Sequence, residues 1–386
     1  MLIDLLYSQV MPVIAFQVVL LGIIISNVFL LHRARRHSAP AQFPPVSILV
    51  PARNEEKRIA ACVQSLLTQD YPDFELLVLD DRSEDATRQI LADIAAKNAR
   101  LRVLPGSPTP PGMLGKNWAC AQLAEEAHGE LLLFTDADTI HHPGGLRAMV
   151  TALLGEDADL LSGYPRQETQ TWGERLLVPF FTWASVTFIP LWLAYRARLT
   201  ALSSAVGQVL LIRRAAYQST GGHLALGASA VDDLELARRI TAAKRAWRMV
   251  YLADLVTCRM YSSGRKAYAG FTKNYFAAFG YRLLPYIFVF GWMLLMFLAP
   301  LALLGAAAAG LAPAAWVDEL ATCVGLSILV WWIPYSVAGI PVWLALFYPA
   351  NILANSLVAA RSLRLSLSGQ VTWKDRPLER PRWKWL

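Results

Sequence analysis

The residues best suited to chemistry are aspartates that follow short apolar runs. Asp136 and Asp138 are separated by one residue and come directly after the apolar run 131–135. Carboxylate oxygens suit Mg²⁺ or Mn²⁺, and an ion held there would neutralise a diphosphate leaving group. We expect one carboxylate to bind such an ion and the other to bind the same ion or the ribose of a donor.

The same spacing occurs again at Asp157 and Asp159. This second pair follows a predicted helix end and precedes a predicted strand, where we expect a solvated turn. Ligands of open α/β sheets bind outside the carboxyl ends of the strands. Position therefore favours the pair at 136 and 138 as the functional one.

Asp80 and Asp81 close another apolar run, 74–79. Helix capping accounts for the residues that follow them, because Ser83 can accept backbone N–H bonds and acids favour the positive end of a helix. Capping does not account for Asp80 and Asp81 themselves. Two like charges side by side at a strand end need a partner or a function.

Asp232 and Asp233 precede the helical spacing of Leu234, Leu236 and Ile240. Helix capping is one interpretation of this pair. The other is a general base that deprotonates an acceptor hydroxyl as it attacks the anomeric carbon of a sugar. A carboxylate can do this at neutral pH if burial or a neighbouring like charge raises its pKa.

The elements that must position these residues alternate along the chain. Strands are predicted at 46–50, 74–79, 101–104 and 131–135, and helices at 59–67, 90–94 and 118–127. This alternation is typical of an α/β domain with a mostly parallel central sheet. Such a sheet would bring the segments 51–56, 80–85 and 136–138 to one crevice.

Composition points to a membrane. The 386 residues are 55% hydrophobic and only 17% charged, against about 45–50% and about 25% in soluble proteins. The net charge of +7 suits an anionic membrane surface or an anionic substrate such as a nucleotide-sugar. The four cysteines have no metal-type spacing. We expect no nucleic-acid partner.

Residues 11–31 form an apolar run long enough to span a bilayer. Asp4 precedes the run and basic residues follow it at 32–36, the reverse of a cleaved signal peptide. We therefore predict a transmembrane anchor over 1–36 with the rest of the chain entering the cytoplasm, in a multi-pass protein of the cell membrane.

Two further apolar regions are expected at the membrane. Residues 176–194 contain two prolines and many aromatic residues, which favours an interfacial helix over a buried core helix. Residues 283–360 form a C-terminal transmembrane region with crossings at about 284–304 and 320–336. A third crossing at 342–360 would leave the basic tail 361–386 outside, so an interfacial or re-entrant segment and a cytoplasmic tail are preferred.

Six ordered blocks give the chain a family resemblance across residues 46 to about 280. They are VSILVPARNEE, LLVLDDRSEDAT, GKNWA, LLLFTDAD, GQVLLIRRAAYQSTGGH and VDDLELARRI. The sequence resembles glycosyltransferase family 2, which has the GT-A (nucleotide-diphospho-sugar transferase) fold. It is most similar to the membrane-anchored branch of bacterial carotenoid- and hopanoid-associated glycosyltransferases and, more distantly, to ceramide glucosyltransferase. The resemblance implies a catalytic domain over 45–280.

The resemblance also implies roles for individual residues. The donor nucleotide would be bound by a loop and by the acids after the second strand, namely Pro51, Ala52, Asn54, Glu55, Asp80 and Asp81. The donor diphosphate or sugar and the metal would meet Lys116, Asp136 and Asp138. Asp233, with Asp232 beside it, would be the catalytic base, and Gly221, Gly222 and His223 would lie towards the acceptor. Lys116 could instead be a solvated lysine at a helix start.

The implied reaction is the inverting transfer of one sugar from a nucleotide-sugar, with a UDP-sugar as the expected donor and Mg²⁺ or Mn²⁺ as cofactor. The acceptor would be the hydroxyl group of a lipid in the bilayer. The family's Gln-x-x-Arg-Trp motif is missing from residues 264–274, which favours single transfer over polymer synthesis. Two alternatives stay open: a polyprenyl-phosphate acceptor, and a non-catalytic membrane scaffold or transport component.

Overall fold

The computed structural model describes residues 2–33, 35–370, 372–373, 376–377 and 382–386. The chain divides into two compact units. The sheet unit comprises Phe29–Glu168 and Leu191–Met260, and the helical unit comprises Met1–Val28, Thr169–Pro190 and Tyr261–Leu386. Part of the predicted basic tail, including Lys374 and Arg380, lies outside the described residues.

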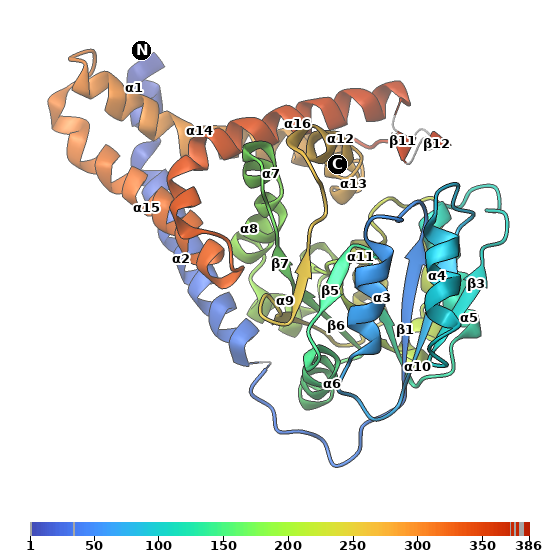
Figure 1. Cartoon of the computed structure of the whole chain (residues 1–386). Coiled ribbons are helices and arrows are strands. Elements are labelled where there is room, and N and C mark those ends of the chain that lie inside the picture. The colour runs from blue at the N-terminus through green and yellow to red at the C-terminus, as the bar shows by residue number, and fades with distance from the viewer. Residues whose placement is uncertain (1, 34, 371, 374–375, 378–381) are drawn as a thin grey trace. The chain divides into compact units, whose positions relative to one another are not determined.

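A seven-stranded sheet forms the centre of the sheet unit (Figure 1), in the order β3-β2-β1-β4-β8-β6-β9. The strands are β1 Val46–Ala52, β2 Phe74–Asp80, β3 Leu101–Pro105, β4 Leu131–Phe134, β6 Leu160–Tyr164, β8 Leu210–Arg213 and β9 Trp247–Tyr251. All run parallel except β8, which is antiparallel to both β4 and β6. The predicted mostly parallel sheet is confirmed, and the four predicted strands are β1 to β4.

Helices and a small second sheet complete this unit. The helices are α3 Ile59–Leu67, α4 Thr87–Ala95, α5 Gly115–Glu126, α6 Gly145–Gly155, α9 Leu191–Ala197, η1 Thr200–Leu202, α10 Arg214–Ser219, η2 Gly222–Leu226 and α11 Asp232–Ala242. The small sheet pairs β10 Val256–Cys258 with β5 Thr139–His141 and β7 Arg166–Gln167. Helix α3 buries Ile59, Cys62, Val63 and Leu66, the face that its apolar spacing predicts.

The start of α4 differs from the capping expected at Ser83. The helix begins at Thr87, whose backbone N–H donates to Oδ1 of Asp85 at 3.0 Å. The hydroxyl of Ser83 instead accepts a bond from the backbone N–H of Asn54, at 3.0 Å. Ser83 therefore joins the loop after β2 to the loop after β1 rather than capping its own helix.

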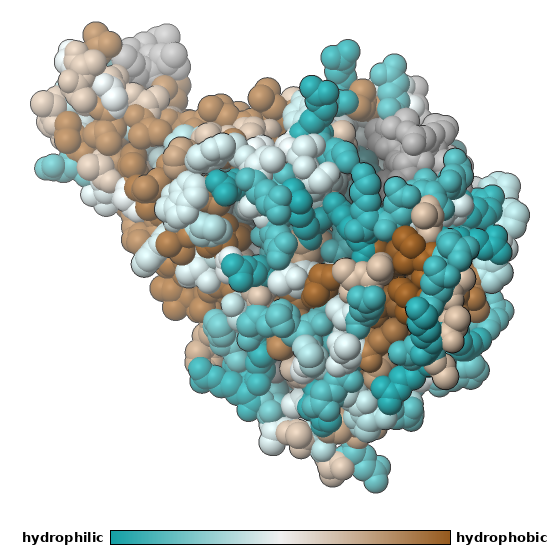
Figure 2. Space-filling model, in the orientation of Figure 1, coloured by the Kyte–Doolittle hydropathy of each residue, from teal (hydrophilic) through white to brown (hydrophobic). Residues whose placement is uncertain are grey.

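The helical unit contains α1 Leu2–Tyr7, most of α2 Val10–Arg33, α7 Trp172–Leu177, α8 Pro179–Phe188, α12 Gly264–Thr272, α13 Tyr275–Ala278, α14 Leu283–Ala308, η3 Ala314–Trp316, α15 Val317–Val337, η4 Val342–Phe347 and α16 Tyr348–Ser368, with the short pair β11 Thr372–Trp373 and β12 Arg376–Pro377. Within the described part of the chain, four helical segments are long and apolar enough to cross a membrane: Asp4–Arg33, Leu283–Ala308, Ala314–Val337 and Val342–Ser368. Hydrophobic residues gather on the surface over α2 and α15 (Figure 2).

The segment 176–194 is not one straight helix. Pro179 lies at the join of α7 and α8, and Pro190 separates α8 from α9. Helix α8 packs inside the helical unit, where Trp183 is fully buried and stacks on Trp331 of α15 with 3.8 Å between ring centroids. More of this segment is therefore buried against other helices than is expected for a helix that lies only at the membrane interface.

Gly129 tests how tightly the sheet unit is packed. A Cβ added there would lie 2.4 Å from the backbone nitrogen of Ser47. Moving backbone atoms to relieve this contact would be energetically costly, so Gly129→Ala should lower the free energy of unfolding by about 1–3 kcal/mol. Thermal unfolding of the purified full-length protein in detergent measures the change. Gly144→Ala is the matched control, since a Cβ there meets no atom within 4 Å. Equal shifts in both variants would contradict the packing argument.

Candidate functional site

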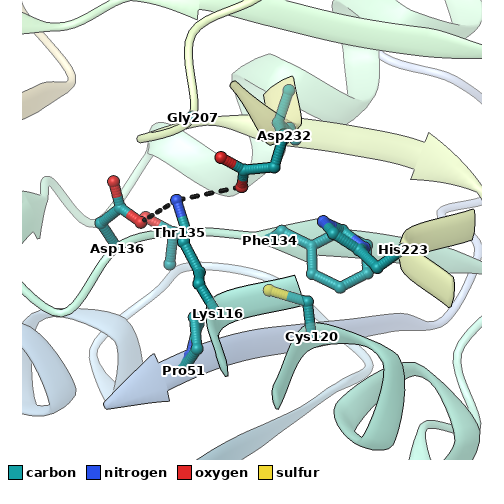
Figure 3. A pocket seen from close by; sticks show the side chains of 10 residues that line it. Pro51, Lys116, Cys120, Phe134, Thr135, Asp136, Gly207, His223 and Asp232 are labelled. Carbon is teal, nitrogen blue, oxygen red and sulfur yellow. Dashed lines mark ion pairs between the residues drawn. The ribbon is translucent and has the colours of Figure 1, made fainter. Parts of the chain in front are cut away.

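A lysine held between two aspartates forms the centre of the site (Figure 3). Nζ of Lys116 lies 2.9 Å from Oδ1 of Asp136 and 3.1 Å from Oδ2 of Asp232. Burial disfavours the charged form, but the two carboxylates outweigh it and raise the pKa of Lys116 well above its usual range. Lys116 is therefore a fixed positive charge and not a solvated lysine.

The three charged residues line a pocket that leaves about 190 Å³ unfilled by protein atoms. Its lining consists of Pro51, Lys116, Cys120, Phe134, Thr135, Asp136, Gly207, Leu210, His223 and Asp232. Five of these residues were candidates from the sequence: Pro51, Lys116, Asp136, His223 and Asp232. This volume includes open solvent, and no part of the pocket has room for a water-sized sphere. A large ligand would therefore have to displace the Lys116 side chain or open the surrounding loops.

Hydrogen bonds between the start of α5 and the segment 227–229 place Lys116. The backbone N–H of Leu114 donates to the carbonyl of Gly227 at 3.0 Å. The side-chain amide of Asn117 donates to the carbonyls of Gly227 at 2.9 Å and Ser229 at 3.0 Å. The segment 227–229 leads directly into α11, so Asn117 fixes the distance between Lys116 and the aspartates at the start of α11.

The direction of β8 brings a further backbone group to the pocket. Because β8 is antiparallel to β4, its first residues lie at the edge where β4 ends. The backbone N–H of Gly207, just before β8, donates to Oδ2 of Asp233 at 2.8 Å. Asp233 thus connects the entry to β8 with the first turn of α11.

The two aspartates of α11 have different surroundings. Asp232 faces Lys116 and lines the pocket. Asp233 accepts bonds from the backbone N–H groups of Gly207 and Leu234, both at 2.8 Å. Burial and the neighbouring charge of Asp232 raise the pKa of Asp233 to about 6. Of the pair, Asp232 anchors the lysine and Asp233 has the higher-than-usual proton affinity.

His223 contributes a neutral imidazole to the pocket. Its backbone N–H donates to the hydroxyl of Tyr217 at 3.0 Å, and the same hydroxyl lies 3.0 Å from Nδ1 of its ring. If the hydroxyl donates to Nδ1, the ring proton sits on Nε2. Within the described residues Nε2 has no hydrogen-bond partner, although His223 is only 1% exposed. The ring packs on Phe134 with 4.6 Å between centroids (Figure 3). Burial lowers the pKa of His223 to about 4.

Asp138, the second carboxylate of the first motif, pairs with a different cation. Its Oδ2 lies 3.2 Å from Nη1 of Arg58, and its Oδ1 lies 3.5 Å from Sγ of Cys258. Burial and the charge of Asp136 raise the pKa of Asp138 to about 7. Among the residues that the structure describes, no group of three or more His, Cys, Asp or Glu could hold a metal ion alone.

The donor set nevertheless fits one kind of ion. Mg²⁺ is usually bound by one or two carboxylates together with substrate phosphates, not by an all-protein cage. Asp136 and Asp138 offer two carboxylates that are close enough for one charge to raise the pKa of the other. These residues fit an ion that arrives with a diphosphate and exchanges for the lysine and arginine contacts.

The loops after β1 and β2 are bonded to each other. The backbone N–H of Glu84 donates to the side chain of Asn54 at 2.9 Å, and that of Glu55 donates to the hydroxyl of Thr87 at 2.8 Å. Asn54 adopts the left-handed region with φ of 54°, which asparagine tolerates better than most residues. The expected convergence of these two loops at one edge is found in the structure.

Asp80 and Asp81 are both 5% exposed and both have partners. Oδ1 of Asp80 accepts from the backbone N–H of Ser83 at 3.2 Å. The carboxylate of Asp81 lies 3.8 Å from Arg53 and 3.5 Å from Arg82. Two arginines therefore offset the like charges that the sequence left without an explanation.

The remaining candidates have structural roles close to the site. Ala52 is buried at the end of β1, and its carbonyl accepts from the backbone N–H of Asp81 at 2.8 Å. Gly221 and Gly222 have φ of 80° and 51° in the turn before His223, and a Cβ on Gly222 would lie 2.4 Å from the Tyr217 ring. Both glycines are thus needed for the turn that presents His223.

Of the aspartate pair at 157 and 159, only Asp157 has the solvent-exposed side chain that the predicted solvated turn requires. The Asp157 side chain is fully exposed, whereas Asp159 lies 3.0 Å from Arg245 and accepts from the backbone N–H of Ala246 at 2.9 Å. Neither residue lines the pocket described above. Identical spacing therefore serves different purposes at the two positions.

Comparison with known proteins identifies the core of the sheet unit. Residues 47–220 match the family model described as glycosyl transferase family 2. They form a glycosyl transferase family 2 domain. The match agrees with the predicted GT-A type, and the α/β fold with apolar helices towards both ends is confirmed.

Individual proteins resemble parts of the chain. It is 37% identical over 113 residues to the beta-monoglucosyldiacylglycerol synthase of Trichormus variabilis, a match that covers 29% of this chain and 24% of that protein. It is 26% identical over 276 residues to the 4,4'-diaponeurosporenoate glycosyltransferase of Staphylococcus aureus, covering 69% and 70%. The mannosyltransferase PcManGT from Pyrobaculum calidifontis, solved with GDP-Man and Mn²⁺, aligns with a TM-score of 0.45 at 18% identity and covers 93% of this chain and 92% of its own.

The family 2 domain also uses residues that the sequence did not single out. Phe134 and Thr135 line the pocket directly before Asp136, so their strand-end position was a usable signal. Gly207 is the first residue of the fifth ordered block. Its only sequence signal was that it is a glycine shortly before an expected strand. Arg58 and Tyr217 gave no signal in the sequence. The partner of Arg58, Asp138, is distant in sequence, and the partner of Tyr217, His223, lies in the following turn.

Two buried imidazoles of the sheet unit allow a measurable prediction. Burial lowers the pKa of both His223 and His141 to about 4, so both rings should stay neutral at pH 5.5. In ¹⁵N-histidine NMR of the full-length protein, two of the six histidines should keep neutral-form shifts at that pH. His223→Gln should remove one of these two signals. A His223 signal that titrates near 6.5 would refute its buried placement.

Proposed function

We propose that this protein transfers a single sugar from a nucleotide-sugar to the hydroxyl group of a membrane lipid. The observation that carries the proposal is Lys116, held between Asp136 and Asp232 in a pocket at the carboxyl edge of the family 2 domain. A fixed positive charge at such a place stabilises the charge that develops on a leaving diphosphate. The names of the two relatives, which refer to a diacylglycerol lipid and to 4,4'-diaponeurosporenoate, support sugar transfer and an apolar acceptor.

The donor would lie across the edge formed by the loops after β1, β2 and β4. Pro51, Ala52, Asn54 and Glu55 form the nucleotide side of this edge, and Asp81 is oriented by Arg53. Lys116 would move from its two carboxylates to the diphosphate. A UDP-sugar is the expected donor.

Asp136 and Asp138 would hold the Mg²⁺ or Mn²⁺ ion. When bound, the ion supplies positive charge that neutralises the diphosphate leaving group. Lys116 contacts Asp136 and Arg58 contacts Asp138, so each of these carboxylates has a positive charge beside it that offsets its own.

Asp233 is the proposed general base. Its pKa of about 6 leaves it mostly deprotonated at neutral pH yet able to accept a proton. The acceptor oxygen bonds to the anomeric carbon as the bond to the donor phosphate breaks, and the hydroxyl proton passes to Asp233. One direct displacement inverts the anomeric centre. Asp232 acts through Lys116 and is a positioning residue.

The membrane part of the proposal rests on hydropathy and charge. The segment Asp4–Arg33 is a candidate crossing, and it is followed by basic residues. The positive-inside rule then places the family 2 domain in the cytoplasm. We propose an anchor over 1–36, a cytoplasmic catalytic domain over 45–280 and a membrane region over 283–360. A scaffold or transport role is disfavoured because this chain has an acidic residue at every position where the family resemblance implies one.

Substitution of the base tests the proposed reaction. Asp233→Asn should lower the transfer rate by about 10²–10⁴-fold and leave nucleotide-sugar binding intact. Lipids from cells that express the parent protein should gain a species heavier by one hexose, which the variant cells lack, in mass spectrometry. Glu235→Gln is the matched control, because Glu235 shares the first turn of α11 but pairs with Arg239 at 3.6 Å.

The outcomes separate the acceptor classes. Near-normal turnover of Asp233→Asn with a hydroxyl acceptor would disprove the base assignment. Activity of the variant with a polyprenyl phosphate, whose oxygen is already ionised, would favour that acceptor. Absence of any heavier lipid from the parent cells would remove the support for lipid glycosylation.

The pH dependence of turnover provides a second test. Asp233 must be deprotonated to act, so kcat should fall about tenfold per pH unit below the pKa of about 6. Asp232→Asn removes a charge that raises this pKa, so the acidic limb should move to lower pH. Turnover measured from pH 4.5 to 8 in both proteins gives the comparison. A limb that stays in place or moves upward would assign the titration to another group.

A further inference from the structure

The last residues of the chain are bonded to the start of α14. The backbone N–H of Leu283 donates to the carbonyl of Lys384 at 2.8 Å, and that of Leu284 donates to the carbonyl of Trp385 at 3.0 Å. In return, the N–H of Lys384 donates to the carbonyl of Tyr281 at 2.9 Å. All of these residues belong to the helical unit. The C-terminus therefore lies on the side of the membrane from which α14 starts.

This contact constrains how often the intervening chain crosses the bilayer. Two segments bonded to each other on one side must be joined by an even number of crossings. The segments Leu283–Ala308 and Ala314–Val337 are two candidates, and Val342–Ser368 would be a third. A return crossing after Gly369 is excluded, because residues 374–382 carry six charges and charged side chains are costly within lipid.

The contacts of α16 agree with an incomplete crossing. The Tyr348 ring at its start lies 6.0 Å from that of Phe297, in the middle of α14. Eleven residues later, the carbonyl of Ala359 accepts from the hydroxyl of Tyr286, at 2.9 Å, in the first turn of α14. The two helices therefore run antiparallel over only the first part of α14.

Beyond Ala359, helix α16 contacts elements that precede α14. The backbone N–H of Phe276 donates to the hydroxyl of Ser362 at 3.1 Å. The guanidinium of Arg361 lies 5.0 Å from the centre of the Tyr268 ring. The second half of α16 thus extends past the first residue of α14 and lies beside α12 and α13.

The approach to α16 turns back on α15. The backbone N–H of Ile340 donates to the carbonyl of Tyr335 at 2.9 Å, and the side chain of Asn351 donates to the Tyr335 hydroxyl at 3.2 Å. Helix η4, between these two contacts, packs against α15. The chain that leaves α15 at Val337 therefore folds back along it instead of moving away.

The faces of α16 are arranged as a lipid environment requires. Its amides are buried against protein, and Asn355 donates to the carbonyl of Leu176 at 3.0 Å. Its exposed side chains are apolar in the first half, with Leu353 at 51% and Leu357 at 63% exposure. Basic residues follow at Arg361 and Arg364, as expected where a helix reaches the headgroups.

We propose that residues 338–368 form a re-entrant hairpin that enters one leaflet from the side on which α14 begins and returns to that side. The hairpin binds the lipids of that leaflet through Leu353 and Leu357, and the C-terminal residues 382–386 lie at the same surface. Trp383 and Trp385, at 38% and 62% exposure, suit this level because tryptophan favours the interface. The inference rests on the proposed membrane location and not on the proposed chemistry.

Accessibility of single introduced cysteines tests the hairpin. Ser368→Cys and Leu386→Cys report the two ends of the segment, Leu311→Cys reports the loop between α14 and α15, and Lys97→Cys reports the family 2 domain. Each full-length variant is treated with a membrane-impermeant maleimide in right-side-out and in inverted vesicles. The parent protein, whose four cysteines are buried, gives the background.

The labels at 368 and 386 should appear in the same vesicles as the label at 97, and the label at 311 in the opposite ones. Labelling of 368 or 386 together with 311 would make α16 a full crossing and overturn the proposal. Labelling of all four positions from one side would overturn it as well, because α14 and α15 would then not cross. The readout needs no sugar transfer, so its failure is distinct from failure of the proposed function.

Discussion

The site depends on one ammonium group placed between two carboxylates. Asp136 lies at the end of β4 and Asp232 in the first turn of α11, and their negative charges would repel each other if nothing lay between them. Lys116 reaches both from the first turn of α5. Removing one partner would leave the remaining charge uncompensated and so destabilise the folded protein. The ion pairs therefore join three elements of the sheet unit.

The three titratable side chains near the Lys116 ammonium group differ in their contacts and therefore in their charge. Asp232 is committed to the lysine, whereas Asp233 is held by the backbone N–H groups of Gly207 and Leu234 and retains its affinity for a proton. His223 lines the same pocket without charge, because the Tyr217 hydroxyl and the Phe134 ring enclose it. Adjacent residues with similar side chains thus perform unlike tasks, since each task is set by what the side chain touches.

The sequence predicted the parts of the molecule that are local. The apolar runs of β1, β2 and β4, and the acids that end them, lie within a few residues of each other, so periodicity and position were sufficient. It did not predict that β8 enters the sheet antiparallel to β4, that Arg58 pairs with Asp138, or that Ser83 bonds to Asn54. Each of these features joins segments distant along the chain, and no local pattern encodes the pairing.

The position of β8 has a consequence for biosynthesis. Strands β4 and β6 are made first, yet β8 lies between them, so until residues 210–213 leave the ribosome each of the two has an edge with no partner. Unpaired strand edges invite association with other chains. An apolar N-terminal helix that docks the nascent protein at the bilayer would limit the encounters of this half-built sheet with its neighbours. The proposed anchor would thus protect assembly of the domain as well as localise the finished protein.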